Sequence, residues 1–449
     1  FIKVNFNVMR FKSFYWFLLL AIICSSCKND DDNQTSGFQG TIDWAKTFGG
    51  SQEDFARSVI QTLDGNILVF GNSTSTDGDI TDKLIEVSDY WLLKLDMEGN
   101  VIWSKTYGGS DEDVGQRVIQ TSDGGYVIVG YSKSNDIDAS NNEGQHDNWI
   151  LKLDSNGTIL WEKSFGYAGH DHAYSVIETS DGGFFMTGFL DITASEGEGS
   201  SVRNNRHGIG EFWCHKLDAN GNLEWRNYFG GTNNDRAYDA VQAIDGGYVV
   251  IGFSESNDFD ISDSKGSYDY WVVKLNTIGE LVWDKSLGGS EIDQARSIIK
   301  TDDNAYIIAG NSFSNDGDIT SNYGSSDFLL IKLSDDGKVL WNKNYGGSQF
   351  DFATSINKSS EGYIVTGYSQ SIDNDVNGNF GDNDFWVLKI SDQGDLNWQR
   401  NFGGSKLDLA YDAFETIDGN IIVVGETESD DVDIDLNKGL KDILAIKIK

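Results

Sequence analysis

The sequence predicts an all-β fold, a seven-bladed β-propeller of four-stranded antiparallel blades. A glycine landmark, Gly-Gly in six cases, recurs seven times at steps of 57 to 64 residues. Within each step lie four runs rich in β-branched and aromatic residues, which is typical of strands. The chain has no proline, and Asp-Gly or Asn-Gly turns join many of these runs as hairpins. A repeat of four short strands favours a radial array of sheets. The landmarks begin at Gly49, Gly108, Gly166, Gly230, Gly288, Gly346 and Gly403.

The repeat that follows Gly108 illustrates the four predicted strands, which we name A to D. Strand A is expected at 115–121 and strand B at 126–132, joined by the turn SDGG. A long polar loop leads to strand C at 148–154, and the turn SNG leads to strand D at 158–165. In such a meander the A–B and C–D turns lie on one face of the ring. The D–A connections and the long B–C loops lie on the other, which we call the top face, and long loops on a rigid scaffold are where binding usually occurs.

The two ends of the repeat array complement each other. The last repeat ends with a strand C at 443–449, ILAIKIK, and no strand D follows it. The first repeat is preceded by a strand D without a strand C, TIDWAKTF at 41–48. We therefore expect the N-terminal strand to complete the seventh blade and close the ring, so that 41–449 forms one propeller domain.

The N-terminal segment carries the features of an export signal. Residues 1–26 contain the basic stretch MRFK and the apolar run FYWFLLLAIIC at 14–24, which is shorter than the roughly 20 residues of a membrane-spanning helix. The segment resembles a bacterial lipoprotein signal with Cys27 as the lipidated (palmitate-carrying) residue; a cleaved secretory signal is the alternative. Residues 27–40 are expected to form an acidic tether. Within it, KNDDD at 28–32 resembles the surface-export tag of some Gram-negative lipoproteins, or is a plain solvated tether. The predicted location is the outer membrane, lipid-anchored and exposed at the cell surface.

Charge and cysteine content restrict the partners. The chain has 71 acidic and 34 basic residues, a formal net charge of −37. Such a field repels phosphate backbones and anionic lipid, so we expect no nucleic-acid partner and membrane contact only through the lipid anchor. Beyond Cys27 the mature chain keeps one cysteine, Cys214, so no disulfide is expected in the folded body. A monomer is expected.

Two motifs carry a family resemblance. KLDxxGNxxWxKxYGGSxxDxAxSV, at 94–118, and DGGYVVxGxSxS, at 123–134, resemble the SBBP-type β-propeller repeat of bacterial exported proteins. The resemblance covers nearly all of the mature chain. It implies the propeller fold but little about chemistry, because one fold hosts many activities. The spacing from Asp96 to Trp103 is also similar to the tryptophan-docking repeat of quinoprotein dehydrogenases, one residue shorter, without a quinone site.

Several residues that resemble functional motifs recur in most or all repeats, which indicates a structural role for them. Twelve of the thirteen tryptophans occupy one position of strand C or one of strand D, which indicates blade packing and disfavours a tryptophan platform for sugars. The GxSxS sequences after strand B lack the second glycine of a nucleophile elbow, and no HExxH, Walker or Rossmann pattern occurs. The favoured function is a non-catalytic binding or scaffold module for a protein or glycan. The alternative is a polysaccharide-acting hydrolase of the endoglucanase type that uses top-face carboxylates.

Two acidic series belong to the top face. An aspartate precedes every strand A and is expected at the channel mouth, either as a turn cap or as a cation ligand on the axis. The B–C loops of six blades carry Asp-x-Asp, for example Asp77 with Asp79 and Asp316 with Asp318. Oxygen ligands at this spacing suit Ca²⁺, and Asx-turns are the alternative. Calcium at these loops is therefore one of two alternatives, and no other cofactor is predicted. The first series is Asp54, Asp113, Asp171, Asp235, Asp293, Asp351 and Asp408.

Blade three departs from the repeat. Its landmark reads SFGYAGHDHAYSV, with Tyr167 and Ala168 in place of Gly-Ser, and its B–C loop, 190–211, lacks Asp-x-Asp. The five histidines of the chain all lie between 146 and 215. Drift in a tolerant loop is one explanation, and a ligand site is the other. His170 and His172 are two apart on an extended segment and could share a side, as zinc ligands can. The predicted ligand-binding residues, the histidine sector, are His146, His170, His172, Arg203, Arg206 and His207.

Overall fold

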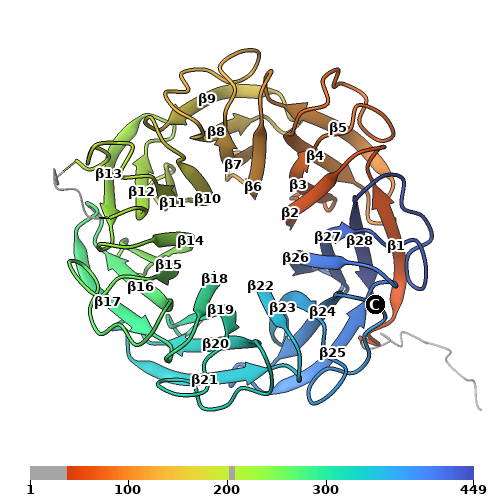
Figure 1. Ribbon diagram of the computed structural model, residues 1–449. Coiled ribbons are helices and arrows are strands. Elements are labelled where there is room, and N and C mark those ends of the chain that lie inside the picture. Colours follow the sequence, from red (N-terminus) through yellow and green to blue (C-terminus); the bar gives the residue numbers. More distant parts are fainter. Residues whose placement is uncertain (1–37, 202–207) are drawn as a thin grey trace, which may run out of the picture. The chain divides into compact units, whose positions relative to one another are not determined.

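The computed structural model describes residues 38–201 and 208–449, which belong to one compact unit. Its strands form seven four-stranded antiparallel sheets, arranged as blades around a central axis (Figure 1). Within the described ranges no helix is long and apolar enough to cross a membrane. The predicted seven-bladed propeller is therefore confirmed.

In each blade the strands run from A, nearest the axis, to D at the rim (Figure 1). The A strands are β2 (Asp54–Gln61), β6 (Asp113–Gln120), β10 (His172–Glu178), β14 (Asp235–Gln242), β18 (Asp293–Lys300), β22 (Asp351–Ser359) and β26 (Asp408–Glu415). The B strands are β3 (Ile67–Ser73), β7 (Tyr126–Ser132), β11 (Phe184–Leu190), β15 (Tyr248–Ser254), β19 (Tyr306–Ser312), β23 (Gly362–Ser369) and β27 (Ile421–Thr427). The C strands are β4 (Asp89–Leu95), β8 (Asp147–Leu153), β12 (Glu211–Leu217), β16 (Asp269–Leu275), β20 (Asp327–Leu333), β24 (Asp384–Ile390) and β28 (Asp442–Ile448). The D strands are β5 (Val101–Tyr107), β9 (Ile159–Phe165), β13 (Leu223–Phe229), β17 (Leu281–Leu287), β21 (Val339–Tyr345), β25 (Leu396–Phe402) and β1 (Ile42–Phe48).

The ring closes through the N-terminal strand, as expected. The seventh sheet has the order β1-β28-β27-β26, with Phe48 opposite Ile443. The amide of Lys449 donates to the carbonyl of Thr41 at 2.9 Å, and the amide of Thr41 donates to the carbonyl of Lys449 at 3.1 Å. Phe38 packs edge-on against Trp398 of blade six, so the ordered contacts begin before β1.

The core lies between neighbouring blades, because the B and C strands are covered on both faces. Most of these strands are buried along their whole length, which explains their continuous apolar sequences. The strand C tryptophans are fully buried, and the indole of Trp271, for example, donates to Asp284 of strand D. The strand D tryptophans reach the next blade, where Trp44 donates to the carbonyl of Met97 at 3.1 Å. The packing role predicted for the tryptophans is confirmed.

Every A strand carries a β-bulge, which lies three residues after the aspartate that begins the strand or, in blade three, directly precedes it. The pairing of β2 with β3, for example, passes from Ala56 to Ser58 and leaves Arg57 without a ladder partner. A bulge redirects the side chain of the extra residue. The bulged residues are Arg57, Gln116, Tyr174, Tyr238, Arg296, Thr354 and Tyr411.

Candidate functional site: a histidine cluster on the top face

The aspartates that precede the A strands are turn caps. In blade one, Asp54 Oδ2 accepts the amide of Gly50 at 2.8 Å and the hydroxyl of Ser75 at 2.9 Å. The equivalent hydrogen bond, from a backbone amide to the aspartate four residues later, recurs in the other six blades. Examples are Gly109 to Asp113 and Gly404 to Asp408. All seven side chains are fully buried, so they do not ring the channel mouth as expected. The cap interpretation holds, and an axial cation site built from these carboxylates does not.

The strand A aspartates have raised pKa values because they are buried, and so do the aspartates that open the C strands. Burial raises the pKa of Asp113 to about 6 and that of Asp384 to about 7, against the hydrogen bonds that these groups accept. Asp384, which opens strand β24, lies close to Asp408, and the charge of Asp408 raises the pKa of Asp384 further. Each blade junction thus buries a pair of acidic groups, one from strand C and one from the following strand A.

The Asp-x-Asp loops are also held by backbone amides. Asp77 Oδ1 accepts the amide of Ser51 at 2.7 Å, and Asp79 Oδ2 accepts the amide of Gly49 at 3.0 Å. The pair in blade five does the same, with Asp316 on Ser290 at 2.7 Å and Asp318 on Gly288 at 3.3 Å. These bonds fix each B–C loop to the glycine landmark of its own blade and explain the motif structurally. Calcium binding at Asp77, Asp79, Asp316 and Asp318 stays a prediction.

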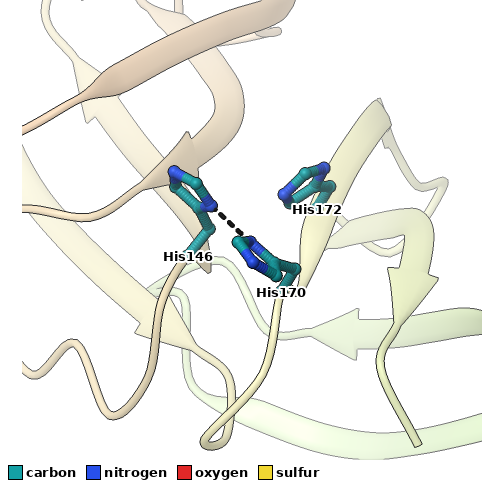
Figure 2. Close-up of side chains that lie close together, drawn as sticks. All are labelled: His146, His170 and His172. Atoms are coloured by element: carbon teal, nitrogen blue, oxygen red, sulfur yellow. Dashed lines mark hydrogen bonds between the residues drawn. The ribbon is translucent and has the colours of Figure 1, made fainter.

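Three members of the histidine sector meet at the junction of blades two and three. His146 lies in the loop before β8, while His170 and His172 lie on the segment that enters β10 (Figure 2). His146 and His170 form a short parallel bridge. We call these three residues the histidine cluster.

The repeat explains why these histidines meet. At other junctions, too, the residue before the strand C acid pairs with the residue before the strand A aspartate, as in Ser326 with Phe350 and Asn383 with Leu407. The bridge occurs at six of the seven junctions, and at the junction of blades one and two the amide of Asp113 still donates to the carbonyl of Ser88. The side chains at these positions differ from junction to junction. The scaffold places any two residues found there side by side, and at the junction of blades two and three both are histidine.

The imidazole nitrogens of the cluster lie close together. Nδ1 of His146 and Nδ1 of His170 are 2.7 Å apart, and one ligand nitrogen from each of the three residues lies within 4.8 Å of the others. Nε2 of His146 lies 3.4 Å from the carboxylate of Glu112. The ring of His172 stacks on Tyr131, with centroids 3.8 Å apart and planes 11° apart. Nε2 of His172 is buried and has no hydrogen-bond partner among the described residues.

The electrostatics favour the neutral form of His146 and His172. Burial lowers the pKa of His172 to about 3, and the neighbouring His146 and His170 lower it further. Burial also lowers the pKa of His146, partly opposed by the carboxylate of Glu112. Neutral imidazole is the form that binds metal ions, and its free nitrogen also accepts hydrogen bonds.

The remaining sequence-predicted residues have other positions. Arg203, Arg206, His207 and the predicted lipidation residue Cys27 lie outside the described residues. His215 is not part of the cluster, because it is buried in β12 against Trp213, with ring centroids 4.1 Å apart.

Tyr167, the exception in the landmark, has a structural role. Its amide donates to Asp171 Oδ2 at 2.7 Å, which preserves the cap found in the other blades. Its hydroxyl contacts Arg226, and its ring packs on Trp213 with centroids 6.0 Å apart. The loss of the second glycine is therefore compensated by aromatic packing.

Sequence reasoning expected a central channel but did not identify the residues that line it. A cavity of about 350 Å³ there is lined by all seven bulged residues. The guanidinium of Arg57 lies 3.9 Å from the ring centre of Tyr411, and that of Arg296 lies 4.2 Å from the ring centre of Tyr238. The histidine cluster connects to this lining, because His172 Nδ1 lies 3.4 Å from the hydroxyl of Tyr174. One signal in the sequence could have identified the lining: the position three residues after the strand A aspartate varies among the blades, whereas the aspartate itself is constant.

Comparisons with known proteins give limited likeness. No protein-family model matches the chain. The chain is similar to the regulatory protein FlaEY of Caulobacter vibrioides, with 25% identity over 264 residues, which cover 54% of this chain and 27% of that protein. The chain thus spans about a quarter of the length of this curated relative.

Solved structures that are similar to the chain include two proteins at low sequence identity. The WD40 domain of Neurospora crassa Pan2 matches with a TM-score of 0.46 and 8% identity, over 90% of this chain and 95% of that one. Sqt1 from Chaetomium thermophilum matches with a TM-score of 0.43 and 10% identity, over 90% of this chain and 99% of that one. At these scores neither structure informs the function of this protein.

Proposed function

We propose that the protein is a non-catalytic binding module, a propeller that holds a protein partner on the top face at the junction of blades two and three. The observation that carries the proposal is the histidine cluster, which replaces unlike residues at equivalent positions of the other junctions. A rigid ring supports the site, and the cluster continues into the channel lining through Tyr174.

The state of the top-face carboxylates supports binding over hydrolysis. A glycosidase needs one carboxyl group to give a proton and another to act as base or nucleophile beside a sugar. The strand A aspartates are buried and accept backbone amides, and one carboxylate oxygen of each Asp-x-Asp residue described above is engaged in the same way. These acids hold turns in place, so they are poor candidates for a reacting pair.

The proposal includes export and anchoring. Residues 1–26 serve as a lipoprotein signal, Cys27 carries the lipid, and 27–40 form the acidic tether to an outer-membrane, surface-exposed propeller of the SBBP type. What supports this is the apolar run at 14–24 followed by CSSC and an acidic stretch.

The test exchanges the cluster for residues that the scaffold already accepts. The variant His146→Ser, His170→Glu, His172→Val carries the residues found at the same positions between blades one and two, Ser88, Glu112 and Val114. A matched control carries the same three residues between blades six and seven: Asn383→Ser, Leu407→Glu, Leu409→Val. Cross-linking on cells identifies a partner of the wild-type protein, and binding is then measured with both proteins purified.

We expect the cluster variant to bind at least tenfold more weakly and the control to bind as the wild type does. Equal binding by all three proteins would place the site elsewhere on the ring. A glycan screen of the same proteins covers the other outcomes. Glycan binding lost with the cluster would change the class of partner, and turnover abolished by a single top-face Asp or Glu substitution would favour the hydrolase.

A further inference from the structure

We propose that His146, His170 and His172 bind one divalent transition-metal ion, for which Zn²⁺ is the best match. The inference goes beyond the proposed function, because metal binding is independent of any partner. Three imidazoles from two chain segments converge with one nitrogen each inside a span of 4.8 Å. The metal site is a property of this junction alone among those described.

The donor set fits zinc better than calcium. Zinc takes imidazole nitrogens at about 2.0–2.1 Å and often binds three protein ligands with a fourth position open. Tetrahedral geometry at that bond length requires nitrogens roughly 3.4 Å apart. For an ion to bind, the 2.7 Å pair of His146 and His170 must open slightly, and the nitrogen of His172 must come closer than the 4.8 Å span of the cluster. Calcium requires several oxygen ligands, and the cluster provides none.

A histidine pair joined by a hydrogen bond does not account for all three rings. One Nδ1–H can bridge His146 and His170, and the bond then uses the lone pair of the other ring. The third ring still has a buried Nε2 without a partner among the described residues. A buried polar nitrogen without a partner is costly and calls for a water or an ion. A metal ion shared by the three residues would satisfy them together.

The backbone around the cluster is already fixed. The amide of His146 donates to the carbonyl of Gly169 at 3.3 Å, and the amide of Asp171 donates to the carbonyl of His146 at 2.7 Å. These bonds hold the two segments on both sides of the His146–His170 bridge. A site whose backbone is set before binding loses little conformational entropy when the ion arrives.

Two neighbours orient the ligands. Glu112 lies 3.4 Å from Nε2 of His146, an ion-pair distance without a hydrogen bond, while Nδ1 of that ring points to His170 and is the nitrogen available to the ion. A carboxylate behind a ligating histidine is the usual second partner of zinc-bound imidazole, and it fixes the ring and its tautomer. Tyr131 holds the ring of His172 by stacking. His170 is exposed, so the open fourth position is accessible from solvent.

The experiment measures zinc alone, without a partner. The full chain is stripped with EDTA, dialysed, and titrated with Zn²⁺ by calorimetry in the presence of millimolar Ca²⁺, which occupies weak acidic sites. We expect one saturable site in the wild type that is absent from the cluster variant and unchanged in the blade six–seven control. Glu112→Gln should weaken binding roughly 10- to 100-fold while the fold is kept. Anomalous diffraction at the zinc edge should give one peak between the three rings.

The outcomes separate this inference from the proposed function. Zinc binding that persists unchanged in the cluster variant, or no saturable binding in the wild type, overturns it. If the cluster variant does not fold, His170→Gln replaces it, because the exposed ring of His170 can be changed without disturbing the core. Partner binding that survives EDTA would support the proposed function without a role for metal. Zinc binding by a protein for which no partner is found would support the metal site alone.

Discussion

Burial gives the carboxyl groups of the blade junctions pKa values above their ordinary value near 4. The pKa is about 6 for Asp113 and Asp408 and about 7 for Asp327 and Asp384. Between pH 4 and 7 the folded protein therefore holds more protons than the unfolded chain. The linkage relation then makes the free energy of unfolding rise as the pH falls from 7 towards 4. The lowered pKa values of His146, His172 and His215 act in the opposite direction below the ordinary pKa of histidine, but these groups are fewer than the buried carboxyl groups with raised values. Carboxyl groups with lowered pKa values, such as Asp64 and Asp123, oppose the trend only as the pH approaches 4.

We predict that the melting temperature is higher at pH 5 than at pH 8, measured in EDTA at constant ionic strength. Asp384→Asn should raise the melting temperature at pH 8 and reduce its dependence on pH. The substitution removes a buried charge beside Asp408 while its amide oxygen can still accept the bond from Phe380. A melting temperature that falls from pH 8 to pH 5 would contradict the raised pKa values.

At the same scale, the sequence located the histidine cluster only approximately. The repeat put His146, His170 and His172 on the top face of adjacent blades, because loop order follows from strand order. The 2.7 Å contact could not be predicted, since it depends on a parallel bridge between a loop and a strand entrance. The bridge recurs at equivalent positions of the repeat, but the sequence alone does not show that these positions pair.

At the scale of elements, β1 determines whether the ring is closed. It supplies the outer strand of the seventh blade, and its partner β28 would otherwise present unpaired amides and carbonyls. We predict that deletion of 28–48 lowers the melting temperature by about 10 °C or more, whereas deletion of 28–37 leaves it nearly unchanged. Thermal unfolding followed by circular dichroism compares the two truncations, and equal melting temperatures would be incompatible with closure through β1.

This element was predictable because an unmatched strand D at one end and an unmatched strand C at the other leave one solution. The bulges of the A strands were not. A stretch such as Asp54 to Val59 reads as an ordinary strand, and the extra residue becomes visible only when β2 is aligned with β3. Register between strands is a tertiary property, so Arg57 and its counterparts could not be assigned to the channel from one strand.

At the scale of the whole molecule, a formal net charge of −37 makes self-repulsion a general cost of the folded state. Raising the ionic strength from about 10 mM to about 150 mM shortens the screening length from about 30 Å to about 8 Å. We predict that NaCl over this range raises the melting temperature, because exposed Lys–Asp pairs, which salt weakens, each contribute little. A flat or falling melting temperature would show that ion pairs outweigh repulsion.

CaCl₂ at matched ionic strength extends this measurement to the acidic loops. An additional rise over NaCl, lost in Asp316→Asn with Asp318→Asn, would support calcium binding at that loop. Identical curves for the two salts would leave the Asp-x-Asp residues as acceptors for backbone amides alone.

The bulge in every A strand lets the residues that line the channel vary independently of the strands that build the blades. A bulged residue has no partner in the ladder, so its side chain can change without shifting any strand. Copies of one repeat can therefore diverge at this position while the blades stay superimposable. The outcome is a sevenfold frame around a lining with no rotational symmetry, in which two arginines, three tyrosines, a glutamine and a threonine occupy equivalent places. A molecule that enters the channel meets four kinds of side chain in an order that does not repeat around the ring, so the ring can hold it in one orientation out of seven.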